Sequence, residues 1–551
     1  MRKLLLTGTT LLVVGATSGQ NPLAVPPLMT ADTFHLVVAP STKEFYPGWV
    51  TETYGINLPY LGYALELQQG DTARFKVYNQ LNEITTMHWN GLEVPPVFDG
   101  SPPREIAPGG TWDVKYKVLD KASMYTYHPH TMDLIGQQVG KGAAGLLIVR
   151  DAEEAALDLP RQWGVDDFPV VVQDKRFNPS GQFINAPLGD SILVNGTARP
   201  FVECPAQVVR LRLANASTAR YYRFGFEDGT VFQVIGGENG LLAAPAPMGR
   251  LTLSSGERAE LLLDLTGMEG DSLLLMSYGS ELPQSVPGSG NILWEGSALN
   301  GADFPVLRIR VTAPTANPVT TIPATLANVQ PYPESSATVS RTKVIEGMGM
   351  VGDVGMFTIN GAEWDMNVIN DTVMLGATEI WEFVNLSNIA HPITMHGGAF
   401  YVLDRDGVPP APWEAGPKSV VNVDVGDTVR IIMRFAVYAT DGWPLMYHCH
   451  NLAHINMMMW QFIVVDPNVG LPALDAARIE VFPVPGDRIT WRAPSPVAAL
   501  RVLDLGGREV LHASGRGHTT GDLDLTSLPA GSYVLELQGL GTRTRTMVMR
   551  P

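Results

Sequence analysis

Alternating apolar and polar positions recur along the chain and set the first expectation about its fold. Three segments alternate and then reach an asparagine: GDTARFKVYNQL (70–81, at Asn79), PAQVVRLRLANAS (205–217, at Asn215) and GATEIWEFVNLS (376–387, at Asn385). A period of two residues is typical of a strand with one buried face. Further strand-like runs close these regions, at 143–151, 305–313 and 459–467. The pattern predicts three related all-β sandwich units, and no helix-period segment of comparable length stands out.

The ends of the chain read differently from these units. Arg2 and Lys3 precede the apolar run 4–14 and the small residues 16–19, which is typical of a secretory signal. A membrane anchor is the alternative, but the run is shorter than the roughly 20 residues that a span needs. No later stretch is apolar and long enough to span a bilayer, so we expect no transmembrane segment in the mature protein, which would be secreted or held at the cell surface after passing through the periplasm.

The domain boundaries follow from composition. The segment 312–336 is rich in Pro, Thr and Ala and is typical of a linker. Short strand-like runs with Gly and Pro turns continue after Asp466 and predict a small fourth β-module. The predicted organisation is a signal peptide at 1–20, β-sandwich domains at 21–158, 159–320 and 321–468, and a C-terminal β-sandwich module at 475–551.

Charge and cysteine content narrow the function. The net charge of −17 disfavours nucleic acid as a partner, because the phosphate backbone repels an acidic surface. Only two cysteines occur, Cys204 and Cys449. We expect no disulfide between them, since Cys449 stands between two histidines and Cys204 lies far away in a strand-like segment. Stability must then come from the apolar cores.

Histidines provide the candidate chemistry. Eight of the 11 histidines fall in four short clusters: His88; His128 and His130; His391 and His396; His448, His450 and His454. Imidazole and thiolate ligands together favour copper or zinc over magnesium or calcium. Cys449, His454 and Met459 follow a Cys-x4-His-x4-Met order, and His391 comes from a separate strand. Two imidazoles, a thiolate and a weak thioether are the ligands of a blue-copper electron-transfer site.

The segments HWNG, HPH, HPITMHG and HCHNLAH together resemble the copper motifs of the multicopper oxidases, the laccase-like family, and the resemblance covers residues from about 35 to 466. It implies three cupredoxin-like Greek-key β-sandwiches. It also implies that a phenolic, other small organic or metal-ion reductant gives electrons to a type 1 copper. A His-Cys-His bridge would carry them to a three-copper cluster, where dioxygen becomes water.

The resemblance also assigns residues. The type 1 copper would be held by His391, Cys449, His454 and Met459. One type 3 copper would be held by His130, His396 and His448, the other by His128, His450 and position 90, and the type 2 copper by His88 and position 394. His448, Cys449 and His450 would be the catalytic electron bridge, and Asp99 matches an acidic position that would help deliver protons.

Three positions depart from the family pattern. Asn90 and Thr394 replace expected histidines, and Ile455 replaces a frequent glutamate. An amide or a hydroxyl is a poor copper ligand beside imidazoles. Two main interpretations stay open: a variant oxidase whose other groups fill the gaps, and a blue-copper electron carrier or copper-binding protein without oxygen reduction. A copper-free scaffold is a third, disfavoured because Cys449 and Met459 are retained.

Two further segments carry predictions. The region of about 475–551 resembles the C-terminal sorting domain of type IX secretion, which implies the type IX machinery as a partner; an ordinary small β-domain is the alternative. The segment GMGMVGDVGM (347–356) is rich in methionine and glycine. It could bind Cu(I), because thioethers suit soft copper, or it could be a loop with methionines packed beneath it.

Overall fold

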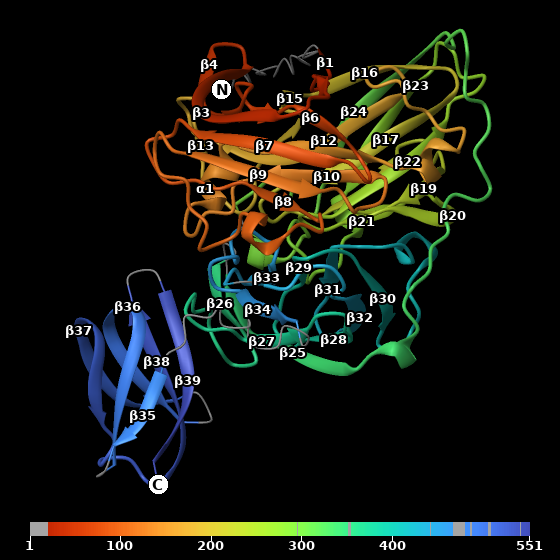
Figure 1. Ribbon diagram of the computed structural model, residues 1–551. Coiled ribbons are helices and arrows are strands. Elements are labelled where there is room, and N and C mark those ends of the chain that lie inside the picture. Colours follow the sequence, from red (N-terminus) through yellow and green to blue (C-terminus); the bar gives the residue numbers. More distant parts are fainter. Residues whose placement is uncertain are drawn as a thin grey trace, which may run out of the picture. The chain divides into compact units, whose positions relative to one another are not determined.

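The computed structural model describes residues 20–294, 296–350, 354–440, 442–466, 480–484, 487–504, 508–539 and 542–550. The predicted signal, 1–20, therefore lies outside the described residues apart from Gln20. The chain divides into two compact units, Met1–Val465 and Asp466–Pro551. The first unit contains three β-sandwiches (Figure 1).

The first sandwich pairs two five-stranded sheets. One sheet runs β2 (Leu28–Met29), β6 (Ala64–Gln68), β11 (Gly145–Arg150), β10 (Ser123–His128), β8 (His88–Asn90). The other runs β5 (Leu61–Gly62), β4 (Trp49–Ile56), β3 (Phe34–Tyr46), β7 (Thr72–Asn79), β9 (Thr111–Lys117). Buried side chains such as Trp89, Tyr127 and Leu147 fill the space between them. Two short helices follow the strands, α1 (Ile135–Gly140) and α2 (Ala152–Ala155).

The second sandwich is the largest and holds no histidine of the four clusters. Its first sheet runs β1 (Asn21–Pro22), β16 (Pro200–Pro205), β24 (Asp303–Thr312), β23 (Ser272–Tyr278), β18 (Tyr222–Phe226), β21 (Leu251–Leu253). Its second runs β15 (Thr197–Ala198), β14 (Ser191–Val194), β12 (Asp167–Phe177), β17 (Val208–Asn215), β22 (Arg258–Asp264), β19 (Phe232–Gly236), β20 (Leu241–Met248), with β13 (Phe183–Ile184) beside β12. Cys204 is buried in the core of this sandwich and Cys449 in the core of the third, and no disulfide joins them.

The third sandwich repeats the plan of the first. One sheet runs β26 (Val354–Ile359), β25 (Val339–Met350), β28 (Thr378–Asn385), β32 (Thr428–Arg434), β30 (Phe400–Arg405). The other runs β27 (Asp371–Met374), β34 (Met459–Val465), β33 (Leu445–Cys449), β29 (His391–Met395), β31 (Val420–Val423). The parallel pair β25–β28 matches β3–β7 in the first sandwich and β12–β17 in the second.

The recurring asparagines have a common structural role. Asn79, Asn215 and Asn385 are each the last residue of a strand, and each carboxamide oxygen accepts the backbone N–H two residues on. Each amide nitrogen donates to two backbone carbonyls, one four or five residues on and one from a distant segment. A buried amide with all these partners fixes the chain where it leaves the strand. The three-unit all-β prediction is thus confirmed.

The C-terminal unit consists of β35 (Glu480–Val484), β36 (Arg488–Leu503), β37 (Glu509–Asp524), β38 (Gly531–Gly539) and β39 (Thr542–Arg550). Its core contains Trp491, Val502, Leu535 and Leu537. The register of β36 shifts between Arg492 and Val497, where the long strand leaves its first stretch of pairing with β37 and begins to pair with β38. Across the described residues, no helix combines the length and apolar character that crossing a membrane requires.

Candidate metal centres

Strand alternation sorts the metal-binding side chains onto two faces of one sheet. In the register of β29 and β33, Ile393 lies opposite Cys449 and Thr394 lies opposite His448. Paired residues project to the same face and successive residues to opposite faces. His391, Ile393 and Cys449 therefore point into the third sandwich, whereas Thr394 and His448 point out of it. The face that carries Thr394 and His448 meets the edge of the first sandwich that carries β8 (Figure 1).

The inward face forms the first cluster. The Sγ of Cys449 lies 3.6 Å from Nδ1 of His391 and 3.9 Å from Nδ1 of His454, and all three residues are fully buried. The Nε2 of His391 lies 3.0 Å from the hydroxyl of Ser387, which leaves Nδ1 to face the sulfur. The ring of Phe357 lies 4.8 Å from the ring of His391 and 4.7 Å from that of His454. The cluster is thus preformed and shielded by an aromatic ring.

The structure places the predicted thioether ligand, Met459, on the face of the sheet opposite to Cys449. Met459 lies opposite His448 in the register of β33 and β34 and packs with Ile135 and Met446, away from Cys449. Met458 belongs to the same buried cluster as Cys449, and its carbonyl accepts the Cys449 N–H at 3.0 Å. The loop after His454 places the preceding methionine, and not Met459, on the cysteine face.

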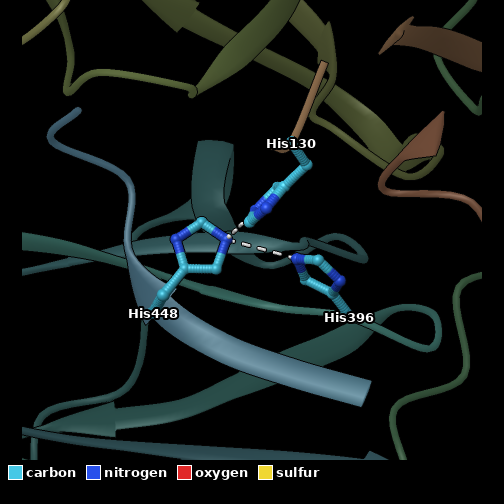
Figure 2. A group of neighbouring side chains, drawn as sticks. All are labelled: His130, His396 and His448. Atoms are coloured by element: carbon cyan, nitrogen blue, oxygen red, sulfur yellow. Dashed lines mark hydrogen bonds between the residues drawn. The ribbon is translucent and has the colours of Figure 1, made fainter. Parts of the chain in front are cut away.

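The outward face and the first sandwich build a second cluster. The Nε2 of His448 lies 3.1 Å from Nε2 of His130 and 3.2 Å from Nε2 of His396. Figure 2 shows the three imidazoles turning nitrogen atoms toward one another from three separate segments. The Nδ1 of His448 contacts the carbonyl of Cys449 at 2.9 Å, so its proton sits there and the Nε2 lone pair faces the cluster. Three converging lone pairs suit a copper or zinc ion.

Asp99 supports this cluster from behind. Its Oδ2 accepts from Nδ1 of His396 at 2.9 Å and from the Ser101 hydroxyl at 2.5 Å, and lies 3.5 Å from Nδ1 of His88. Burial alone would raise the pKa of Asp99, but His396 and His88 outweigh it and hold that pKa well below its usual range. A carboxylate behind a ligating imidazole orients the ring and strengthens it as a ligand. Asp99 therefore contacts ligand residues and not the converging lone pairs.

The third predicted cluster differs. The side-chain nitrogen of Asn90 lies 3.3 Å from Nε2 of His128 and 2.9 Å from Nε2 of His450. The amide thus stands between the two imidazoles to which the resemblance assigns the other type 3 copper. Burial, and then the guanidinium of Arg258, lower the pKa of His450 to about 4.

The predicted type 2 position is also altered. The hydroxyl of Thr394 donates to the carbonyl of Ser419 at 3.0 Å, so it is bound to the backbone just before β31 (Val420–Val423). The Nδ1 of His88 contacts the carbonyl of Asp99 at 2.8 Å, and its ring stacks on His396 at 4.1 Å. One imidazole therefore stands where the resemblance expects two.

The residues fit copper in two places. Burial is the main cause that lowers the pKa values of His391, His130, His396 and His448, which keeps these imidazoles neutral and their lone pairs available. The three ligands of the inward cluster and the three histidines of the outward cluster match the donor set that copper takes in proteins. The groups around Asn90 and Thr394 do not. Ser387 and Phe357 support the inward cluster, and sequence patterns did not identify them.

Comparison with known proteins agrees with this geometry. A family model described as multicopper oxidase matches residues 39–154, and a second with the same description matches 329–468. The chain is 31% identical to the cell division protein FtsP of Sodalis glossinidius, over 84% of this chain and 98% of that protein. It is 30% identical to the multicopper oxidase mco of Staphylococcus haemolyticus, over 77% of this chain and 86% of that protein.

The fold matches solved structures as well. A multicopper oxidase from Pediococcus acidilactici superposes with a TM-score of 0.72 at 30% identity, covering 82% of this chain and 92% of that one. The two family-model matches, 39–154 and 329–468, lie in the first and third sandwiches, which carry both clusters. The chain belongs to the multicopper oxidase family.

Proposed function

We propose that this protein is an exported copper oxidoreductase that accepts electrons from a small reductant at a type 1 site formed by His391, Cys449 and His454, with Met458 as the weak fourth ligand. One observation carries the proposal: the inward cluster is complete, buried and adjacent in sequence to the outward one. When bound, copper supplies one-electron redox chemistry at both clusters. Cys449 and His448 are neighbours in β33, so a short covalent path joins the two sites.

The chain's own residues prepare the first site. The Ser387 hydroxyl positions His391, and Phe357 covers both imidazoles and keeps water away. A rigid, dry ligand set changes little between oxidation states, which favours fast electron transfer.

The hairpin β25–β26 supports a metal-ion reductant. Met348 and Met356 lie directly opposite each other across the hairpin, and their side chains are 68% and 64% exposed. Met350, 56% exposed, is two residues from Met348 on the same face. Met356 precedes Phe357, which contacts both type 1 histidines. Thioethers suit Cu(I), so this methionine face is a docking place for Cu(I) close to the electron-accepting site. A phenolic or other small organic reductant is the alternative.

A second candidate function is an electron carrier or copper-binding protein without oxygen reduction. The replacements at Asn90 and Thr394 favour it, because both lie on the side where dioxygen would react and none lies at the type 1 site. The similarity to FtsP, whose name refers to cell division, fits a family member with another role.

Spectroscopy combined with oxygen uptake separates the two functions. Copper-loaded protein should be intensely blue, and an oxidase should consume dioxygen when given Cu(I), a phenol or an aromatic diamine. Blue protein that takes up no oxygen would refute the oxidase and support the electron carrier. Colourless copper-loaded protein would refute both functions. Replacing Met348 and Met356 together by leucine should slow Cu(I) oxidation and leave phenol oxidation unchanged.

We also propose export by the type IX route, with removal of residues 1–20 and of the C-terminal module. The module folds around its own core and is a compact unit separate from the sandwiches. Mass spectrometry of the protein recovered outside the cells should find both termini shortened. Intact residues 475–551 on the released protein would contradict this route.

A further inference from the structure

We propose that the Asn90 carboxamide takes the place of a copper ion, linking His128 and His450 by hydrogen bonds, so that the chain holds two coppers. One belongs to the type 1 site and the other to His130, His396 and His448. The copper count rests on the proposed function. The amide link does not, because it concerns the protein without metal.

The hydrogen-bond directions can be assigned from His128. Its Nδ1 lies 2.9 Å from the carbonyl of Pro129, which can only accept, so the proton of the neutral ring sits on Nδ1. Its Nε2 therefore presents a lone pair toward Asn90. Only the NH2 group of the carboxamide can satisfy that lone pair, which fixes the orientation of the Asn90 side chain.

The same NH2 group also serves His450. Its nitrogen lies 2.9 Å from Nε2 of His450 and 3.3 Å from Nε2 of His128. An amide nitrogen carries two hydrogens, and each meets one imidazole lone pair. Those lone pairs are the ones a copper ion would require, so metal binding would first have to break both hydrogen bonds inside a buried site.

A buried cation, the guanidinium of Arg258, lies near His450. The Nη1 of Arg258 donates to the carbonyl of Gly256 at 3.1 Å, and the ring of His450 lies so close over Gly256 that a Cβ there would come within 2.6 Å of it. The guanidinium is always charged and opposes a further positive ion nearby. The adjacent carboxylate of Glu238 is already paired with Lys418 at 3.1 Å.

The complete cluster of His130, His396 and His448 can be compared with the Asn90 site within the same protein. Around His448, three Nε2 atoms converge within 4.8 Å of one another, and among the described residues no amide is hydrogen-bonded to them. Around Asn90, a neutral donor occupies the equivalent centre. Thr394, whose hydroxyl is committed to Ser419, leaves His88 without a second imidazole.

The test uses the full chain with two substitutions. Asn90→His restores an imidazole in place of the amide and should raise the copper content from two to three per chain. Asn90→Leu, the matched control, removes the donor without adding a ligand and should leave the count at two. In the copper-free protein, Asn90→Leu should lower the Tm by several degrees, because two buried lone pairs lose their donors.

The outcomes separate the claims. Three or four coppers in the unaltered protein, or a count that stays at two in folded, blue Asn90→His, would overturn the copper assignment. An unchanged Tm in copper-free Asn90→Leu would overturn the amide link. A colourless unaltered protein would refute the proposed function, whereas the Tm comparison would still decide the role of Asn90.

Discussion

Two histidine groups in this protein occupy related positions and differ in one side chain. His130, His396 and His448 direct three lone pairs to one point, whereas His128 and His450 direct theirs to the amide of Asn90. A donor between two imidazoles satisfies a buried site without a metal, and three acceptors alone require an ion or protons. The difference shows how a single residue can convert a metal site into a structural hydrogen-bond network while the surrounding histidines remain.

The largest expected effect comes from removing the thiolate. Cys449→Ser should abolish the blue absorption completely and reduce bound copper by one per chain, because a serine hydroxyl does not replace a thiolate as a copper ligand. Visible absorption and metal analysis provide the measurement. His130→Ala is the control: it should also lose one copper and yet stay blue. Blue colour in Cys449→Ser would contradict the division into two clusters.

The complete histidine cluster should depend on Asp99. Asp99→Asn removes the carboxylate that accepts from His396, and we expect the affinity for copper at this cluster to fall roughly 10–100-fold. A chelator titration monitors the loss, with the blue absorption as an internal control. Equal weakening of both coppers would mean that the variant disturbs the fold and not this cluster.

Replacing Met458 and Met459 separately tests which of the two methionines faces Cys449. Met458→Leu should change the blue spectrum and raise the reduction potential, since it removes a weak donor from the copper. Met459→Leu should leave both unchanged. Each replacement conserves volume and should cost less than about 1.5 kcal/mol of stability. A spectral change only in Met459→Leu would restore the assignment predicted from spacing.

The smallest expected effect is that of Glu93 and Asp120 on the pH dependence of stability. Burial, together with Asp120 nearby, raises the pKa of Glu93 to about 7, and burial raises that of Asp120 to about 7. Both pKa values lie above those of the unfolded chain, so the folded protein binds more protons between about pH 4 and pH 7. The free energy of unfolding should therefore fall as the pH rises through that range.

Replacing Asp120 should reduce this slope. In the unaltered protein the Glu93 N–H donates to Oδ1 of Asp120 at 2.9 Å. The carboxamide oxygen of the Asp120→Asn variant can accept the same hydrogen bond, but the carboxamide cannot ionise. We expect the variant to be more stable than the unaltered protein at pH 8 by on the order of 1–2 kcal/mol. Urea denaturation at pH 5 and pH 8 measures the difference. An identical pH slope in both proteins would show that other groups cause it.

Much of the fold follows from local pattern. The alternating segments that end at Asn79, Asn215 and Asn385 are strands of three related sandwiches, because period-two alternation reflects one buried face and needs no tertiary information. The histidine clusters were also found in sequence. The alternation that continues into β34 also indicates the face of Met458, because Met458, Trp460 and Phe462 share the core that contains Cys449.

Other parts of the site depend on contacts that no local pattern contains. Phe357 reaches His391 from β26 and Ser387 contacts it from the loop before β29, whereas Arg258 reaches the region of His450 from the second sandwich. Sequence analysis identified Asn90 and Thr394 as missing ligands. It could not predict that the amide would bridge two histidines, or that the hydroxyl would turn to Ser419, because both outcomes depend on which segments fold next to them.

The origin of the ligands has a mechanical consequence. His130 comes from the first sandwich, and His396 and His448 come from the third, so an ion bound among them fastens two sandwiches together. By mass action, their separation should become harder as copper becomes more available. The amide of Asn90 fastens the same two sandwiches through His450 and requires no metal. When copper is scarce, the connection through the metal site is lost but the hydrogen bond between Asn90 and His450 remains. The first and third sandwiches would therefore stay associated before copper binds.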